Sequence, residues 1–205
     1  MAPLTDWFPD LTAEQQARFT AMEDLYREWN TRINVISRKD MENIRSHHIL
    51  HSLAIAKLFD FPAGSTVLDV GTGGGFPGIP LAVRFPGARF TLCDSIGKKI
   101  KVAQAVADGL GLDNVECVNA RAEDLKDRYD FVVSRAVADL ATFYPWVKGK
   151  FRNAVFCLKG GDLEAETAAC AKRCRIDPAK FYIANISNWF DDPWFDGKKI
   201  VMISQ

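Results

Sequence analysis

The glycine-rich turn at residues 71–75 is the feature that most constrains this chain. A short apolar run over residues 66–70 leads into the glycines, and a second apolar run over residues 89–93 ends at Asp94. This is the layout of a nucleotide-binding βαβ unit. In such a unit glycines let the backbone approach a ligand closely, and an acid after the second strand accepts hydrogen bonds from ribose hydroxyls. The sequence therefore predicts an α/β fold with a nucleotide site at the end of its first strand.

The spacing of the glycines narrows the class of ligand. Position 76 is Phe, which breaks the G-x-G-x-x-G pattern of dinucleotide-binding proteins, and no P-loop sequence is present. The pattern is D-x-G-x-G-x-G instead, formed by Asp69, Gly71, Gly73 and Gly75. It resembles the first motif of S-adenosylmethionine (SAM)-dependent methyltransferases of the Rossmann-like class, so SAM is the expected cofactor. A nicotinamide or other nucleotide site and a ligand-free tight turn are the alternatives.

Composition is consistent with one soluble domain. The chain has 205 residues, of which 48% are hydrophobic and 25% charged. No apolar run approaches the ~20 residues of a membrane span, and no secretory signal is visible. None of the five cysteines has C-x-x-C spacing, so we expect a reducing cytoplasmic environment and no structural zinc.

The formal net charge is zero, which does not by itself indicate a nucleic-acid-binding protein. Positive charges are nonetheless grouped along the chain. The groups lie within residues 27–45, 98–101, 148–152 and 172–175. An ordinary solvated surface is the alternative interpretation of each group.

The chain divides into a helical front part (residues 1–62) and an α/β body (residues 63–205). Thr12 and Gln15 form a predicted capping box, and apolar residues then recur in steps of three and four up to Ile33. A second helix is expected from about residue 40 to about residue 59.

Strands and helices alternate through the body. Strands are expected at residues 66–70, 89–94, 115–119, 130–134, 154–159, 181–186 and 199–203, and helices at 78–84, 98–110, 140–148 and 163–171. This alternation predicts a seven-stranded, mostly parallel sheet with helices on both faces. The methyltransferase sheet ends in an antiparallel hairpin, which the last two strands could supply.

Six segments, in order, carry a resemblance to one family. They are W-N-x-x-I-N-V-I-S at 29–37, H-I-L-x-S at 48–52, D-V-G-T-G-G-G-F-P-G-I-P-L at 69–81, D-S-x-G-K-K at 94–99, S-R-A at 134–136 and L-K-G at 158–160. They resemble the RsmG family (older name GidB), bacterial methyltransferases that modify a guanine N7 in small-subunit ribosomal RNA. Two positions depart from the family pattern: His47 stands in place of Arg, and His51 in place of Asp.

The resemblance implies roles for individual residues. Gly71 and Phe76 would contact SAM, Asp94 would bind its ribose, and Arg135 would be a further SAM-site residue. The full implied cofactor-binding set is Asp69, Gly71, Gly73, Gly75, Phe76, Asp94, Ala122, Glu123 and Arg135, with Ala122 and Glu123 bordering the adenine. For Asp94 the alternative is a strand-end cap, and for Arg135 it is a structural ion pair.

Two further basic residues are candidates for the reaction itself. Arg121 and Lys159 match basic family positions at strand ends and would position a substrate phosphate or guanine. Simple solvated charges are the alternative. The front helices and basic groups would form the RNA face, and Trp29, Asn34, Arg38 and His48 lie in front-part segments that match the family.

The resemblance implies transfer of the SAM methyl group to N7 of a guanine in 16S ribosomal RNA of the small subunit. Guanine N7 is an unprotonated acceptor, so it can attack in line with no general base. His47 and His51 lack an acidic partner for a metal, and Cys157 lies in a predicted buried strand, so neither metal nor covalent catalysis is expected. A monomer is expected. A small-molecule methyltransferase or a non-catalytic SAM-binding protein is the alternative.

Overall fold

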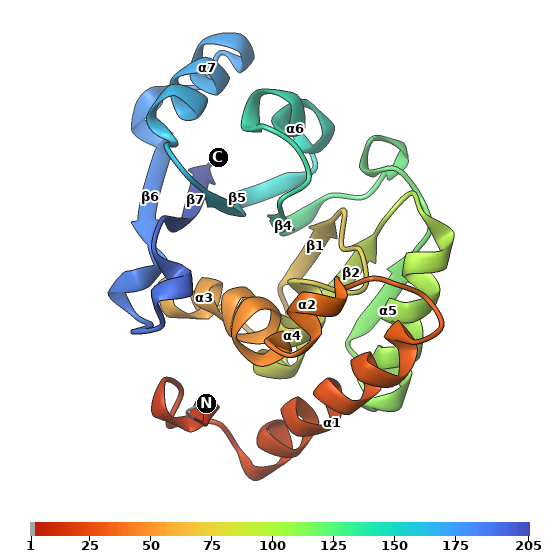
Figure 1. Ribbon diagram of the computed structural model, residues 1–205. Helices are drawn as coiled ribbons and strands as arrows, with labels where there is room; N and C mark the ends of the chain where they lie inside the picture. The colour runs from red at the N-terminus through yellow and green to blue at the C-terminus, as the bar shows by residue number, and fades with distance from the viewer. Residues whose placement is uncertain (1–2) are drawn as a thin grey trace.

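A parallel sheet with one antiparallel edge organises the molecule (Figure 1). The computed structural model describes residues 3–205, except for the side chain of Arg38. The prediction for Arg38 therefore lies outside the described residues. None of the described helices is long and apolar enough to cross a membrane.

The seven strands follow the order β3-β2-β1-β4-β5-β7-β6. They are β1 (Thr66–Val70), β2 (Arg89–Cys93), β3 (Val115–Val118), β4 (Tyr129–Arg135), β5 (Phe151–Gly160), β6 (Phe181–Asn185) and β7 (Lys198–Ser204). Strands β1 to β5 pair in parallel, whereas β7 runs antiparallel to both β5 and β6. The predicted seven-stranded, mostly parallel sheet with a terminal antiparallel hairpin is confirmed.

Helices cover both faces of this sheet. They are α1 (Ala13–Asn30), α2 (Arg38–Met41), α3 (His51–Leu58), α4 (Gly78–Arg84), α5 (Gly97–Gly109), α6 (Leu140–Val147) and α7 (Glu164–Cys174). Helices α6 and α7 lie on one side of the sheet, and α1, α3 and α4 lie on the other (Figure 1). Helices α4, α5 and α6 each lie between two parallel strands in the sequence, as expected because parallel strands need a crossover connection.

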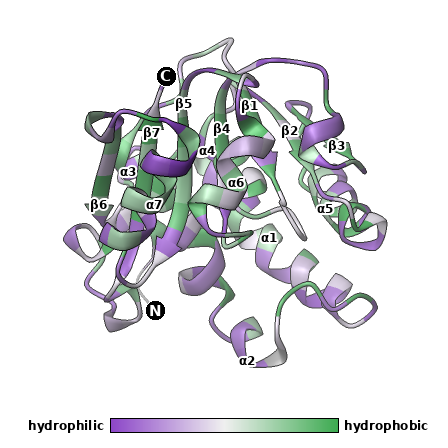
Figure 2. Cartoon of the chain, turned by 90° about the horizontal axis from the view of Figure 1, so that it is seen from above, coloured by the Kyte–Doolittle hydropathy of each residue, from purple (hydrophilic) through white to green (hydrophobic). Residues whose placement is uncertain are grey.

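Side chains of the central strands alternate between two hydrophobic clusters. In β4, Phe131 and Val133 join the cluster under the front helices, whereas Val132 joins the cluster under α6 and α7. The strands are accordingly apolar along most of their length (Figure 2). A sheet buried on both faces leaves its carboxyl edge as the open place for a ligand.

The front part shares the first of these clusters with the sheet. Phe19, Met22 and Tyr26 of α1 are buried together with Phe90 of β2 and Phe131 of β4. The Thr12–Gln15 capping box forms as predicted, with both reciprocal hydrogen bonds present. The two parts share one hydrophobic cluster, so no separate core marks a boundary between them. The division at residue 62 remains a prediction.

The single helix predicted over residues 40–59 is wrong in detail. The segment consists of α2, a π-helix (Ile44–Leu50) and α3. Ile44 and Ile49 are both fully buried although they are five residues apart, a spacing that matches a π-helix better than an α-helix. A hydrophobic pattern with a period of 3.6 residues describes an α-helix, so such a pattern does not reveal the wider turn.

Candidate functional site

Asp69, a buried residue of β1, holds the loop between β1 and α4 in place. This carboxylate is fully buried, and its Oδ2 accepts hydrogen bonds from the Thr72 hydroxyl (2.6 Å) and the Gly78 backbone N–H (2.7 Å). Burial raises the pKa of Asp69 to about 7. The residue therefore fixes both ends of the glycine turn from beneath it.

Gly71 and Gly73 allow the turn for different reasons. Gly71 has φ +67°, and a Cβ there would lie 2.5 Å from Cγ2 of Val137. Gly73 has φ +59°, but a Cβ there would meet no atom within 4 Å. Gly71 is thus required by conformation and by packing, whereas Gly73 is required by conformation and faces open space.

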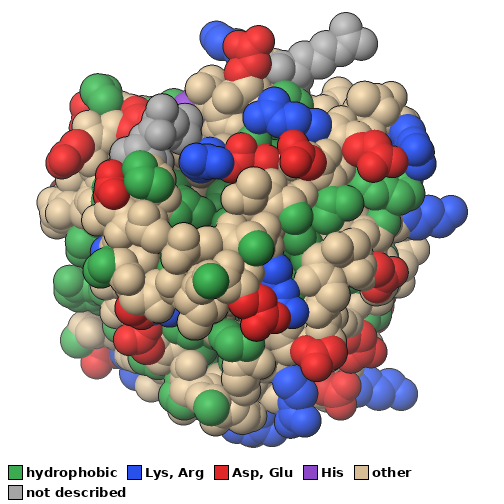
Figure 3. Space-filling model, turned by 90° about the horizontal axis from the view of Figure 1, so that it is seen from below, with side chains coloured by type: hydrophobic (Ala, Val, Ile, Leu, Met, Phe, Trp, Pro, Cys, Tyr) green, Lys and Arg blue, Asp and Glu red, His purple; other side chains and the backbone are tan. Residues whose placement is uncertain are grey.

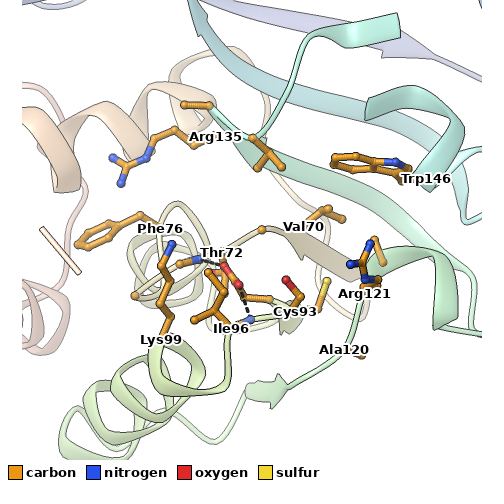
Figure 4. Close-up of a pocket in the computed structure, with 18 of the residues that line it drawn as sticks. Val70, Thr72, Phe76, Cys93, Ile96, Lys99, Ala120, Arg121, Arg135 and Trp146 are labelled. Carbon is orange, nitrogen blue, oxygen red and sulfur yellow. Dashed lines mark hydrogen bonds between the residues drawn. The ribbon is translucent and has the colours of Figure 1, made fainter. Parts of the chain in front are cut away.

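Asp94 follows β2 and links two loops. Its Oδ2 accepts from Gly73 N–H (3.0 Å) and its Oδ1 accepts from Ile96 N–H (2.8 Å) (Figure 4). Each carboxylate oxygen has two lone pairs, so both can still accept a further hydrogen bond. Asp94 also lines the cavity, so these free lone pairs are those of a wall residue.

These loops enclose a cavity of about 490 Å³ at the carboxyl ends of β1, β2 and β4. The volume is in the usual range for small-molecule sites. Eight predicted site residues line it: Gly71, Gly73, Phe76, Asp94, Arg121, Ala122, Glu123 and Arg135. The other three do not. Asp69 lies beneath the loop, Gly75 packs against Ile79 and Tyr26, and Lys159 lines a neighbouring cavity.

Arg135 is half-buried at the end of β4, and none of the ion pairs among the described residues includes it. Its polar partners among the described residues are the His47 carbonyl oxygen (3.4 Å) and Nδ1 of His48 (3.0 Å). Burial and the nearby guanidinium lower the pKa of His48 to about 3, so this ring is neutral. The pKa of Arg135 falls to about 10, which leaves it charged at neutral pH. A cation whose direct contacts are with neutral groups is suited to an anionic ligand.

The front part forms one wall of the site. The Tyr26 hydroxyl donates to the Gly74 carbonyl oxygen (2.8 Å), and the Tyr26 ring stacks on Phe76 with centroids 4.6 Å apart. The guanidinium of Arg135 lies 5.0 Å from the Phe76 ring centroid. Val35, in the turn after α1, reaches the cavity beside Gly74. Helix α1 therefore supports the glycine loop directly.

The two predicted substrate-positioning residues do not come together. Arg121 lies beneath Trp146, across the cavity from Phe76 and Arg135 (Figure 4). Lys159 forms an ion pair with Glu166 (2.6 Å) and donates to the Ala138 carbonyl oxygen (2.8 Å). Arg121 is thus beside Ala122, at the end predicted to hold adenine.

Sequence reasoning missed several residues of the cavity. Trp146 lies on α6, and Val137 follows the strand end at Arg135. Ile96 and Lys99 follow Asp94 and could have been found from that motif. The sequence carries no comparable signal for Trp146, because only the packing of α6 brings it to the site.

The cysteines of the sheet are not poised as nucleophiles. Burial raises the pKa of Cys93 and of Cys157 to about 12, so both are protonated thiols at neutral pH. His47 and His51 instead pack on Trp194. His47 stacks with ring centroids 4.0 Å apart, and His51 makes an edge contact at 5.2 Å.

Comparison with known proteins places these features in context. Residues 15–187 match the family described as rRNA small subunit methyltransferase G. The chain is 48% identical to ribosomal RNA small subunit methyltransferase G of Bacteroides fragilis, with all of both chains covered. It is 50% identical to the protein of the same name in Flavobacterium psychrophilum, covering 99% of this chain and 97% of that one.

Solved structures support the fold. Magnesium protoporphyrin IX methyltransferase of Synechocystis, solved with bound SAM, aligns with a TM-score of 0.60 over 98% of this chain and 95% of its own, at 17% identity. A SAM-dependent methyltransferase of Aquifex aeolicus aligns with a TM-score of 0.55 over 80% of this chain and 97% of its own, also at 17% identity.

Proposed function

Because the chain belongs to the GidB family of small-subunit rRNA methyltransferases, we propose that it transfers the methyl group of SAM to N7 of a guanine in 16S ribosomal RNA. The observation that carries the proposal is the glycine-lined cavity, which combines an acid at the end of β2 with a cation lacking an acidic partner at the end of β4. Those are the strand ends at which an open α/β sheet binds a nucleotide.

The residues present fit SAM. Gly73 leaves open space where any other residue would place a Cβ, and Asp94 retains lone pairs for ribose hydroxyls. Ala122 and Glu123 would border the adenine, and Arg135 would meet an anionic group such as the carboxylate of the methionine moiety. When bound, SAM supplies an electrophilic methyl group.

The chain acts by positioning and electrostatics. N7 of guanine has a free lone pair at neutral pH, so no residue has to remove a proton before the attack. The thiol of Cys93 stays protonated and is not needed as a nucleophile. Holding the base and the methyl group in line can contribute several orders of magnitude in rate.

The target guanine has to leave its stack to reach the cavity. The front segments beside the cavity are proposed to meet the RNA, since Val35 and His48 lie next to Phe76 and the glycine loop. The face seen from below carries Lys and Arg side chains scattered among Asp and Glu (Figure 3). A surface of mixed charge is consistent with modest affinity for free RNA and with help from the assembled subunit. We further propose that the protein acts as a monomer in the cytoplasm.

The proposal is tested with SAM carrying a labelled methyl group and small subunits from cells that lack this enzyme. Label is expected in 7-methylguanosine after digestion, and it is expected to disappear with Gly73→Asp, which places a charged side chain in the cavity. Label in another nucleoside would refute the N7 assignment. No label in RNA, with SAM still bound, would favour a small-molecule substrate or a non-catalytic SAM-binding protein.

A further inference from the structure

A second cavity of about 370 Å³ adjoins the SAM cavity. Arg135 and Ala136 line both, so the two cavities meet at the end of β4. Ala136 has φ +51°, a conformation that is rare for a residue with a side chain and common at functional sites. Glu166 of α7, Lys159 of β5 and His51 of α3 also line the second cavity.

Glu166 offers an acceptor in this cavity. Its Oε1 accepts from the Leu140 backbone N–H (2.7 Å) and pairs with Nζ of Lys159 (2.6 Å). Both contacts involve the same oxygen, so Oε2 remains available to a ligand. The ion pair and the backbone contact fix the carboxylate between β5, α6 and α7.

His51 offers a second polar group. Only 7% of this residue is exposed, and its Nε2 has no hydrogen-bond partner among the described residues. Burial holds the pKa of His51 well below its usual value, so the ring is neutral. A buried polar atom without a partner is destabilising, so a hydrogen-bond partner for this nitrogen would be favourable.

We propose that this second cavity receives the target guanine base and that Glu166 recognises its N1–H and N2–H groups. The proposal rests on the proposed function. N7 has to face the SAM cavity, and the N1 and N2 donors lie on the opposite side of the purine, where Glu166, which lines the second cavity alone, can meet them. Enzymes that act on an extruded base commonly read this edge.

The arrangement also explains how adenine would be rejected. Adenine presents an acceptor at N1 and no amino group at C2, so Oε2 of Glu166 would have no donor to accept from and would face the lone pair of N1. The ammonium group of Lys159, beside Glu166, is suited to the guanine O6 acceptor. The cavity thus carries an acceptor and a donor in the pattern that guanine requires.

The test compares binding of GMP, IMP and AMP to the protein saturated with S-adenosylhomocysteine, measured by ligand-observed NMR. The wild type is expected to bind GMP at least about tenfold more tightly than AMP, because a hydrogen bond to a charged group contributes about 1.5–3 kcal/mol. IMP, which lacks the 2-amino group, is expected to bind with intermediate affinity. Glu166→Gln is expected to weaken GMP by about tenfold and AMP very little.

Glu164→Gln is the matched control, because Glu164 is exposed on the same helix. It is expected to leave all three affinities unchanged. If Glu166→Gln weakened the binding of all three nucleotides equally, Glu166 would have a merely structural role, and the proposal would be overturned. Equal affinity of the wild type for GMP and AMP, or no binding of GMP, would also overturn it. If 7-methylguanosine still forms in those cases, the proposed function stands without this inference.

Discussion

At the scale of single residues, two aspartates divide the work around the glycine turn. Asp69 is buried beneath the loop, accepts hydrogen bonds from Thr72 and Gly78, and is not among the residues that line the cavity. Asp94 fixes the turn through Gly73 and also lines the cavity. One acid therefore builds the loop, and the other both builds it and faces the cavity.

The glycines of the turn are not equivalent, and paired substitutions should show it. Gly71→Ala combines a positive φ with a contact of 2.5 Å to Val137, whereas Gly73→Ala has the positive φ alone. Gly73→Ala is expected to lower the free energy of unfolding by about 1 kcal/mol, and Gly71→Ala by more. Calorimetric SAM binding and chemical denaturation check both variants. Equal losses would contradict the packing argument.

Burial of His48 should make the stability of the protein fall at acid pH. Its folded pKa is about 3, below the ordinary value of 6.5, so the folded state disfavours the protonated ring. The stability it contributes is fully present above pH 6.5 and is lost as the pH falls toward 3. His48→Gln, which keeps an acceptor for Arg135, is expected to make the free energy of unfolding depend less on pH between 6.5 and 3. Chemical denaturation at a series of pH values measures this dependence. The same dependence in wild type and variant would refute the role given to His48.

At the scale of elements, α1 acts as a brace for the SAM loop. Tyr26 is fully buried and reaches the Gly74 carbonyl oxygen, while its ring supports Phe76. The π-helix contributes in the same region, since the His47 carbonyl oxygen accepts from Arg135. Front-part elements thus shape the proposed cofactor site as well as the proposed RNA face.

Tyr26→Phe tests this brace. The substitution leaves a buried carbonyl oxygen unpaired, at a cost of about 1–3 kcal/mol in the free energy of unfolding, and is expected to weaken SAM binding. Tyr182→Phe on the edge strand β6 is the control, because Tyr182 is 51% exposed. Wild-type SAM affinity in Tyr26→Phe would show that the contact is dispensable.

At the scale of the whole molecule, the strands were predictable because their apolar runs are short and clearly bounded. Helix α4 matches its predicted bounds, and each strand overlaps its prediction. The π-helix, the bond from Tyr26 to Gly74 and the place of Trp146 depend on packing between distant segments, which local patterns do not encode. Lys159 shows the same limit, because its pairing with Glu166 in a separate cavity is not visible in the sequence.

The shared core predicts that residues 63–205 do not fold alone. Phe19, Met22 and Ile49 belong to the same hydrophobic cluster as apolar side chains of the sheet. Removing residues 1–62 would expose those sheet side chains to water. The shortened chain is expected to be insoluble or to lack a cooperative unfolding transition. A soluble fragment that unfolds cooperatively and binds SAM would show that the front part is a separate unit.

The most direct test of the account is nucleoside mass spectrometry of small-subunit RNA from cells with and without this gene. Deletion is expected to remove one 7-methylguanosine per 16S RNA, the wild-type gene to restore it, and Gly73→Asp not to restore it. An unchanged content of 7-methylguanosine, or loss of a different nucleoside, would contradict the account.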